Sequence, residues 1–140
     1  TKEEFEEMKK HVRNGVEVIR SIEHALGESP LLHIAGQIIE GHHEKWDGTG
    51  YPRGVKGDDI PIPGRLMALV DVYDALISRR VYKAPMPHSQ AMEIIKEGSG
   101  FYFDPDIVDA FLAQENQFRQ VALKFADFNE EREMLSLHTS

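Results

Sequence analysis

The sequence contains no cysteine, and this absence excludes two kinds of site. Without thiols the chain forms neither a disulfide framework nor a thiolate metal site, so any bound metal must be held by histidine, aspartate or glutamate. Long apolar runs are absent as well. No stretch approaches the ~18 residues of a membrane-spanning helix, and no basic-then-apolar leader opens the chain. We therefore expect a domain that does not insert into membranes and that works in the cytoplasm.

Basic residues are in the minority. The chain carries 24 acidic and 16 basic side chains, which gives a formal net charge of −8. A domain with this balance has no field that attracts a phosphate backbone, so a nucleic-acid polymer is not expected as a partner. At 140 residues with 41% hydrophobic content, the chain is long enough for one domain with its own core.

Segments of alternating apolar and polar residues are lacking, so the expected fold class is all-α. Apolar residues instead recur at spacings of three and four from Phe5 to Ile22, which is typical of an amphipathic helix that buries this stripe. Thr1 and Glu4 form a capping-box pattern at the start of this helix, and Gly27 marks its end.

Four further helices are predicted from caps and helix breakers. Ser29-Pro30 begins the second helix, whose inward face is expected to include His42. Glycine and proline are dense in residues 47–63, which predicts a long ordered loop there. The later helices are expected near residues 63–78, at residues 87–97 before Gly98, and from Pro105 after the N-cap Asp104.

The helix near residues 63–78 is apolar on most sides, a pattern typical of a buried helix. Asp71 and Asp74 interrupt it. A buried carboxylate is costly unless a cation or hydrogen bonds satisfy it. We therefore expect a buried helix whose two aspartates are informative, because a cation or hydrogen bonds must satisfy them.

Four residues form a candidate metal site: His11, His42, His43 and Asp71. Imidazole and carboxylate suit iron, manganese, zinc or nickel, and helical folds draw such ligands from different helices. Adjacent histidines point about 100° apart on a helix, so this pair suits two metals, which can clamp both oxygens of a phosphoryl displacement. Taken singly, each of the four is also compatible with a purely structural role. The remaining histidines carry no such signal: His24, His33, His88 and His138.

The stretch "HHEKWDGTGYP", residues 42–52, resembles the signature of the HD-GYP family, a branch of the HD phosphohydrolase superfamily. "GDDIPIPGRLMALVDVYDALISRRVY" and "FDPDIVDAF" follow in the family's order, and the resemblance spans about His11 to Leu112. It implies an all-α helical bundle of the HD-domain type, with about five to seven helices and a long ordered GYP loop. It also implies hydrolysis of cyclic di-GMP at two or three divalent metals, most often iron or manganese.

The resemblance implies metal-ligand roles for the same four residues: His11, His42, His43 and Asp71. Glu44 and Asp47 match acidic positions of the signature, where they would orient the ligands or fix the loop. The attacking group would be a metal-activated water, so no side chain of this segment is expected to be the nucleophile.

Five other positions match substrate or partner contacts of the family: Gly50, Tyr51, Pro52, Arg80 and Lys83. The GYP element would shape the substrate mouth and contact GGDEF-type domains. The two basic residues would bind the substrate phosphates, since an arginine guanidinium can donate two parallel hydrogen bonds to phosphate oxygens. Two structural alternatives stay open, because Tyr51 can simply pack under its loop and Arg80 can simply pair with Asp74.

One departure from the family pattern is the lack of any His-Asp dipeptide, the pair whose aspartate bridges the metals. We therefore expect a truncated domain, with residues 1–114 as the GYP-bearing part and residues 115–140 as a helical extension or tail. Such a fragment should be metal-free or partly occupied, and inactive or very slow. Loss of upstream helices would expose apolar surface, which predicts a tendency to form homodimers.

The sequence thus predicts part of a metal-dependent phosphodiesterase in signal transduction, whose metal-activated water attacks cyclic di-GMP to give pGpG or GMP. Two alternatives stay open. One is a non-catalytic interaction or sensing module that uses the GYP loop, and the other is an HD phosphohydrolase for another nucleotide. A His-Asp pair upstream would favour the enzyme, and its absence there would favour the module.

Overall fold

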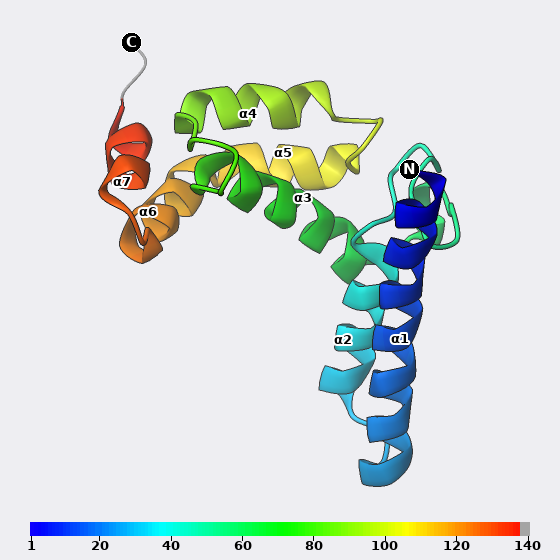
Figure 1. The fold of residues 1–140 in the computed structure, drawn as a ribbon. Coiled ribbons are helices and arrows are strands. Elements are labelled where there is room, and N and C mark those ends of the chain that lie inside the picture. The colour runs from blue at the N-terminus through cyan, green and yellow to red at the C-terminus, as the bar shows by residue number, and fades with distance from the viewer. Residues whose placement is uncertain (138–140) are drawn as a thin grey trace. The chain divides into compact units, whose positions relative to one another are not determined.

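The computed structural model describes residues 1–137, and the predicted all-α class is confirmed within them (Figure 1). Seven α-helices and one short 3-10 helix, η1, make up this part of the chain, with no β-strand. Their bounds are α1 Lys2–Leu26, α2 Pro30–Gly41, η1 Gly57–Asp59, α3 Ile62–Ile77, α4 His88–Glu97, α5 Pro105–Ala113, α6 Glu115–Phe125 and α7 Asn129–Ser136.

The helix ends largely follow the predicted caps. The Thr1 side chain accepts a hydrogen bond from the Glu4 N–H at 3.2 Å, and the Glu4 carboxylate completes the capping box. Asp104 caps α5 by accepting a hydrogen bond from the Asp106 N–H at 2.9 Å. Ser29 differs from the prediction, because it precedes α2 without a side-chain hydrogen bond.

The chain divides into two compact units, one ending at Ala68 and the other starting at Leu69, so that the boundary lies inside α3. The domain boundary expected after Gln114 stays a prediction. Beyond that position, α6 and α7 contribute Phe118 and Leu135 to the core of the second unit. The described part of the tail is therefore helical and packed.

The first unit is built on an antiparallel hairpin of α1 and α2 (Figure 1). Val12 of α1 is buried, but Phe5 and Met8 of the predicted stripe are 40% and 48% exposed. The prediction that the stripe is buried along its whole length is therefore wrong at its first turns. The reason is length: α2 has 12 residues against the 25 of α1 and covers only part of it.

Two glycines allow α2 and α3 to meet. Gly41 ends α2, Gly64 lies in the first turn of α3, and both are buried. A Cβ on Gly64 would lie 2.6 Å from the Gly41 Cα, a distance that real Cβ atoms do not tolerate. The backbones therefore cross with no side chain between them, which fixes where the chain emerges after α2.

The second unit has a continuous apolar core. α3 contributes Leu69, Tyr73 and Ile77, which are 0%, 4% and 5% exposed. The other buried members are Ala91, Met92, Ile95, Phe103, Val108, Phe111, Ala126 and Leu135. Asp71 and Asp74 are exposed, so the expectation that they are buried is wrong. α3 buries a single stripe with a spacing of four, and both aspartates lie off that stripe.

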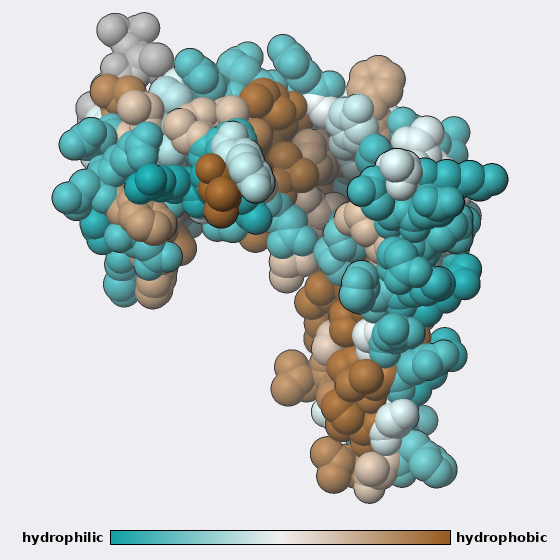
Figure 2. All heavy atoms as spheres, in the orientation of Figure 1, coloured by the Kyte–Doolittle hydropathy of each residue, from teal (hydrophilic) through white to brown (hydrophobic). Residues whose placement is uncertain are grey.

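Apolar side chains are also exposed on the α1–α2 hairpin (Figure 2). On α2, Leu31 is 75% and Ile34 is 45% exposed, and they lie one turn apart. No helix within residues 1–137 is long and apolar enough to cross a membrane. The expected homodimer stays a prediction.

Candidate functional site

Two neighbouring histidines mark the point where α2 ends. The helix stops at Gly41, so His42 is its C-cap residue and lies just past the helix where the sequence predicted a helical position. The His42 N–H still donates to the Ile38 carbonyl at 3.0 Å. The His42 and His43 rings have their centroids 3.9 Å apart, and both residues are half-buried.

The His42 ring is held in one tautomer. Its Nδ1 lies 2.7 Å from the Ile38 carbonyl oxygen. A carbonyl oxygen only accepts hydrogen bonds, so in the neutral ring Nδ1 carries the proton and Nε2 keeps its lone pair. Metal-binding histidines show this arrangement, in which the second ring nitrogen donates to a backbone carbonyl. The donor set thus fits a metal at His42 Nε2.

Glu44 ties the following loop to the end of α2. It is only 3% exposed, and its Oε1 accepts a hydrogen bond from the Arg53 N–H at 2.7 Å. Its Oε2 is also buried and accepts no hydrogen bond from the part of the chain that is described. The hydrogen bond to Arg53 thus supports the predicted role of Glu44 in fixing the loop. The second carboxylate oxygen, Oε2, remains available to another group.

The loop folds back tightly on the histidines. The Tyr51 N–H donates to the His43 carbonyl at 3.1 Å. A Cβ on Gly50 would lie 2.6 Å from both the His43 oxygen and the Glu44 Cα, so a side chain at this position has no room. The glycine of the GYP element is therefore required by backbone packing.

Asp47 fixes the turn at the start of the loop. Its Oδ1 accepts hydrogen bonds from the Thr49 hydroxyl at 2.7 Å and from the Thr49 N–H at 3.0 Å. These hydrogen bonds, the hydroxyl first, lower the pKa of the Asp47 carboxyl below its usual range. The predicted role of Asp47 in fixing the loop is thus supported by contacts.

Tyr51 lies between two other rings. Its ring is stacked on His43 with a centroid distance of 4.8 Å and an interplanar angle of 15°. On α1, Phe5 meets the Tyr51 ring edge-on at 5.1 Å and 77°. Burial raises the pKa of the Tyr51 hydroxyl. The sequence analysis did not identify Phe5 as a site residue, because the local spacing of residues does not record a contact with a residue 46 positions away.

Arg65 anchors the far end of the loop to α3. Its side chain is only 12% exposed, and its Nε donates to the Ile60 carbonyl at 2.6 Å. Its guanidinium also pairs with Asp58 at 3.3 Å and lies 5.7 Å from the Trp46 ring centroid. This residue too was missed, and an arginine in the first turn of an apolar helix was the available signal.

The four predicted ligands are divided between the two units. His11 is exposed on α1 in the first unit, whereas Asp71 is exposed on α3 in the second. The structure brings His42 and His43 side by side. Within residues 1–137, no group of three or more histidine, aspartate or glutamate side chains is arranged to hold a metal. The ligand assignment stays a prediction.

Arg80 and Lys83 close a tight turn after α3, each donating its N–H to the other's carbonyl at 2.9 and 3.1 Å. The Lys83 ammonium donates to the Ala75 and Leu76 carbonyls at 3.1 and 3.0 Å. Arg80 lies 3.8 Å from Asp74 in an exposed ion pair, as the structural alternative foresaw. Their predicted contacts with substrate phosphates stay predictions.

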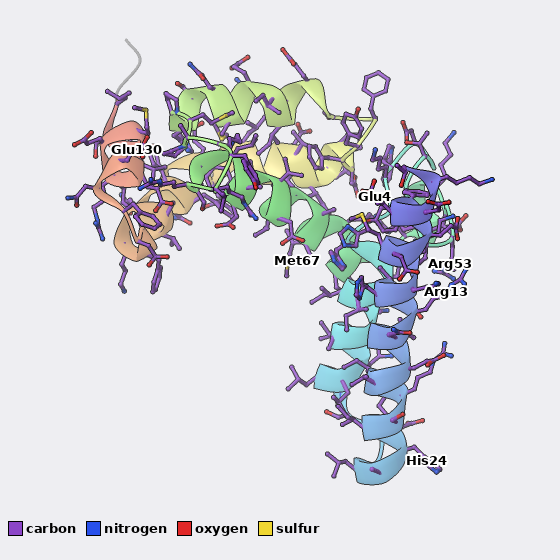
Figure 3. All side chains as sticks on the ribbon, viewed as in Figure 1. Glu4, Arg13, His24, Arg53, Met67 and Glu130 are labelled. Atoms are coloured by element: carbon purple, nitrogen blue, oxygen red, sulfur yellow. The ribbon has the colours of Figure 1, made fainter. Side chains whose placement is uncertain are left out.

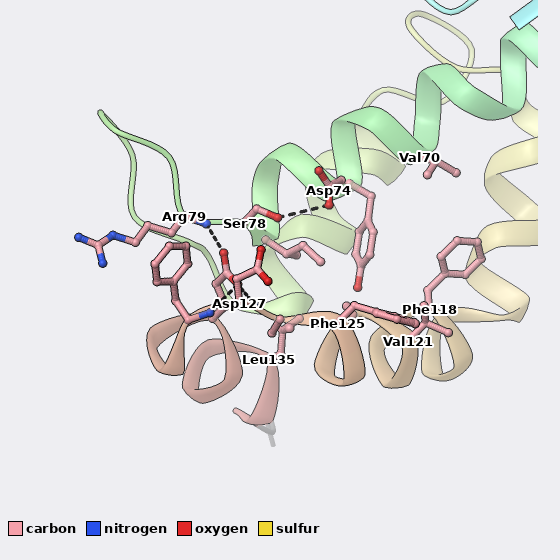
Figure 4. A pocket seen from close by; sticks show the side chains of 15 residues that line it. Val70, Asp74, Ser78, Arg79, Phe118, Val121, Phe125, Asp127 and Leu135 are labelled. Carbon is pink, nitrogen blue, oxygen red and sulfur yellow. Dashed lines mark hydrogen bonds between the residues drawn. The ribbon is translucent and has the colours of Figure 1, made fainter.

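A separate cavity of about 420 Å³ lies within the second unit, between the end of α3 and the helices α6 and α7 (Figure 4). Its walls are mostly apolar and include Phe118, Val121 and Phe125. The buried Glu131 closes one side by accepting hydrogen bonds from the Arg79 and Asp127 N–H groups at 2.7 and 3.0 Å. None of the predicted site residues lines it.

The other histidines have no place in the candidate site. His24 lies at the end of α1 remote from Glu4 and Arg53 (Figure 3). His88 is 7% exposed, and its Nδ1 is 3.0 Å from the Tyr73 hydroxyl in the core of the second unit. His138 lies outside the described residues.

Comparisons with known proteins come from sequence and from structure. A model of the HD domain family matches residues 1–107. A cyclic di-GMP phosphodiesterase of Vibrio cholerae is 55% identical over 127 residues, covering 91% of this chain and 26% of that protein. The 3′3′-cGAMP-specific phosphodiesterase 2 of the same organism is 38% identical over 125 residues, covering 89% and 23%.

A solved structure also resembles this chain. The crystal structure of a cyclic GMP-AMP-specific phosphodiesterase of V. cholerae superposes with a TM-score of 0.57 at 24% identity, covering 85% of this chain and 26% of that one. This likeness shows the fold. The chain spans 26 to 32% of the length of three curated relatives that it matches.

Proposed function

Because the chain belongs to the HD domain family, we propose that it is the GYP-bearing part of a metal-dependent phosphodiesterase that hydrolyses cyclic di-GMP to pGpG or GMP. A relative named for this activity is 55% identical. The observation that carries the proposal is the pair of imidazoles 3.9 Å apart, of which His42 is held in a metal-binding tautomer. We place the activity in the cytoplasm and in the longer protein of which this chain would form a part.

The ligands proposed for two or three divalent metals, iron or manganese, are His42 and His43 with His11 and Asp71. The protonated Nδ1 of His42 leaves Nε2 ready to bind, and Glu44 offers a buried oxygen nearby in the chain. When bound, the metals would supply positive charge for the phosphate and lower the pKa of the attacking water. The bridging aspartate would have to come from outside this chain.

Arg80 and Lys83 are the proposed phosphate contacts. In the structure their charged groups are already engaged, Arg80 by Asp74 and Lys83 by the last carbonyls of α3. The Arg80–Asp74 pair is 58% and 65% exposed, so breaking it would cost about 1 kcal/mol or less. Arg80 is therefore free to exchange its partner for a phosphate, whereas Lys83 is better suited to shaping the turn.

The proposal is tested first by metal content and hydrolysis. Elemental analysis would compare this 140-residue chain with the same protein extended upstream by about one domain half. We expect about two or more metals and cyclic di-GMP hydrolysis in the extended form, and little of either in the chain alone. An extended form without metal and without activity would overturn the proposal.

Single substitutions in the extended protein test the ligand assignment. His42→Ala and Asp71→Ala should each abolish metal retention and hydrolysis, because each removes a metal ligand. His24→Ala is the matched control, since His24 lies at the remote end of α1. If either variant keeps the wild-type metal content, the substituted residue is not a metal ligand. His138→Ala is expected to be neutral as well.

A second candidate function is a non-catalytic module that binds a partner, such as a GGDEF-type domain, through the GYP loop. Within residues 1–137 no three-ligand group is arranged to hold a metal, and a partner-binding module would not need one. A His-Asp pair upstream of this chain would favour the enzyme, and its absence there would favour the module. Titration calorimetry with cyclic di-GMP, cyclic GMP-AMP and a GGDEF-type domain would separate the candidates. Partner binding without turnover in the extended protein would favour the module, and preference for cyclic GMP-AMP would correct the substrate.

A further inference from the structure

Four aromatic rings form a continuous row in the first unit: Phe5, Tyr51, His43 and His42. Neighbouring centroids are 5.1, 4.8 and 3.9 Å apart along this row. The row runs from the first turns of α1, across the GYP loop, to the end of α2. It joins three segments that are far apart in the sequence and ends on two of the proposed metal ligands.

We propose that Tyr51 and Phe5 are positioning residues that hold the His43 imidazole in its metal-binding orientation. The inference rests on the proposed function, because it takes His43 to be a ligand. It assigns the tyrosine of the GYP element a task besides substrate or partner contact. It also gives Phe5 a role in the site.

The geometry suits this task. A histidine ring turns about its χ2 bond, and this rotation has broad and shallow preferences, so packing against a neighbouring ring restricts it. Tyr51 lies nearly parallel to His43, at 15° and 4.8 Å, and therefore restricts the rotation of the ring out of this plane. The neighbouring His42 ring has a hydrogen bond from its Nδ1 to the Ile38 carbonyl.

Tyr51 is itself fixed at both ends. Its backbone N–H bonds to the His43 carbonyl at 3.1 Å, which ties the tyrosine to the residue whose ring it covers. The edge of the Phe5 ring packs against the Tyr51 ring. Such edge-to-face aromatic pairs are more stabilising than the burial of their apolar area alone. Phe5 is 40% exposed, so among residues 1–137 it is not a member of the buried core.

The test measures Mn²⁺ affinity in the full-length protein by calorimetry, together with thermal unfolding of each variant. Tyr51→Leu keeps the apolar bulk and removes the ring, and should weaken binding ~10-fold or more, as for other groups that orient metal ligands. Tyr51→Phe keeps the ring and should stay within about twofold of wild type. Phe5→Ala should have a smaller effect of about 2- to 10-fold.

Phe101→Ala is the matched control, because Phe101 is a 62% exposed aromatic side chain of the second unit that has no part in the row. It should leave Mn²⁺ affinity unchanged. In the metal-free protein, Tyr51→Leu should also remove the contribution of Tyr51 to the ring-current shift of the His43 ring protons, with the unfolding temperature little changed. That combination separates positioning from general stability.

The proposal is overturned if Tyr51→Leu binds Mn²⁺ as tightly as wild type, or if Tyr51→Phe loses as much affinity as Tyr51→Leu. The second result would assign the effect to the hydroxyl group. Failure of the proposed function is distinguishable. If the Mn²⁺ affinities of the variants rank as expected but the protein does not hydrolyse cyclic di-GMP, the positioning role is supported and the proposed activity is wrong. A wild-type protein that binds no metal would contradict both the positioning role and the metal-dependent activity.

Discussion

The two units of the molecule are held together in different ways. In the second unit, eleven buried residues form one apolar cluster. In the first unit, Val12 and Ile60 are the buried apolar residues among those described, and the loop after α2 is held by polar groups, above all Glu44 and Arg65. The proposed imidazole ligands lie in the unit with the smaller apolar core. Stability and site chemistry should therefore respond to different substitutions.

The largest effect is expected from the core of the second unit. Ile95 is fully buried, and Ile95→Ala should lower the free energy of unfolding by about 2–5 kcal/mol, because it removes apolar contacts and leaves a cavity. Ile94→Ala is the matched control, since the neighbouring isoleucine is 39% exposed. Urea unfolding of both variants measures the difference. Equal losses of unfolding free energy in the two variants would mean that the burial of Ile95 does not determine its contribution to stability.

A buried carboxylate is expected to matter next. Glu131 accepts hydrogen bonds from the N–H groups of Arg79, Asp127 and Phe128, and Glu131→Ala would leave these partly buried donors without that partner. We expect a loss of about 1–3 kcal/mol in unfolding free energy. Glu133→Ala on the exposed side of α7 should be nearly neutral in the same urea titration. A neutral Glu131→Ala would show that α7 is held by its apolar contacts alone.

The pH dependence of stability should trace to His88. Burial lowers the pKa of its imidazole below the ordinary value of 6.5, helped by the Arg119 charge and opposed by Glu115. Since the folded state binds the proton less tightly, the stabilisation is full above pH 6.5 and is lost as the pH falls below it.

Thermal unfolding between about pH 8 and pH 5 measures this dependence. His88→Gln should flatten the curve on its acid side, because the variant lacks the buried imidazole at position 88. His24→Gln, at an exposed position, should keep the wild-type slope. An unchanged slope in His88→Gln would assign the acid sensitivity to other groups.

The smallest effect on stability is expected from Arg80→Ala. Its ion pair with Asp74 is long, at 3.8 Å, and both side chains are more than half exposed. The free energy of unfolding should change by less than about 1 kcal/mol. Cyclic di-GMP binding to the full-length protein should weaken with metal content unchanged. Loss of metal in this variant would show that the phosphate role is wrong.

Local signals predicted the helices well because each signal acts within a few residues. The Thr1 capping box, the Asp104 N-cap and the stop at Gly98 all coincide with observed helix ends. The same locality explains the failures. The aspartates of α3 were expected to be buried because the helix is apolar on most sides, but a helix buries only the stripe that meets its neighbours.

The candidate site was only partly predictable for the same reason. The signature marked the histidines and the GYP loop, and the structure brings both together through Glu44 and Tyr51. Phe5 and Arg65 were missed because their contacts depend on how a long loop folds back, which spacing within a helix does not record. The metal-ligand roles themselves are proposed from the family resemblance, which no spacing within a helix supplies.

The crossing of α2 and α3 at Gly41 and Gly64 has a consequence for mutational scanning. Every other residue at Gly64 places an atom against the Gly41 backbone, so tolerance should be as low there as at the proposed metal ligands. A scan scored on activity would thus rank two chemically inert positions beside His42. Scoring the same library for protein abundance would separate them, since the glycine variants should disappear from the folded pool and the histidine variants should not.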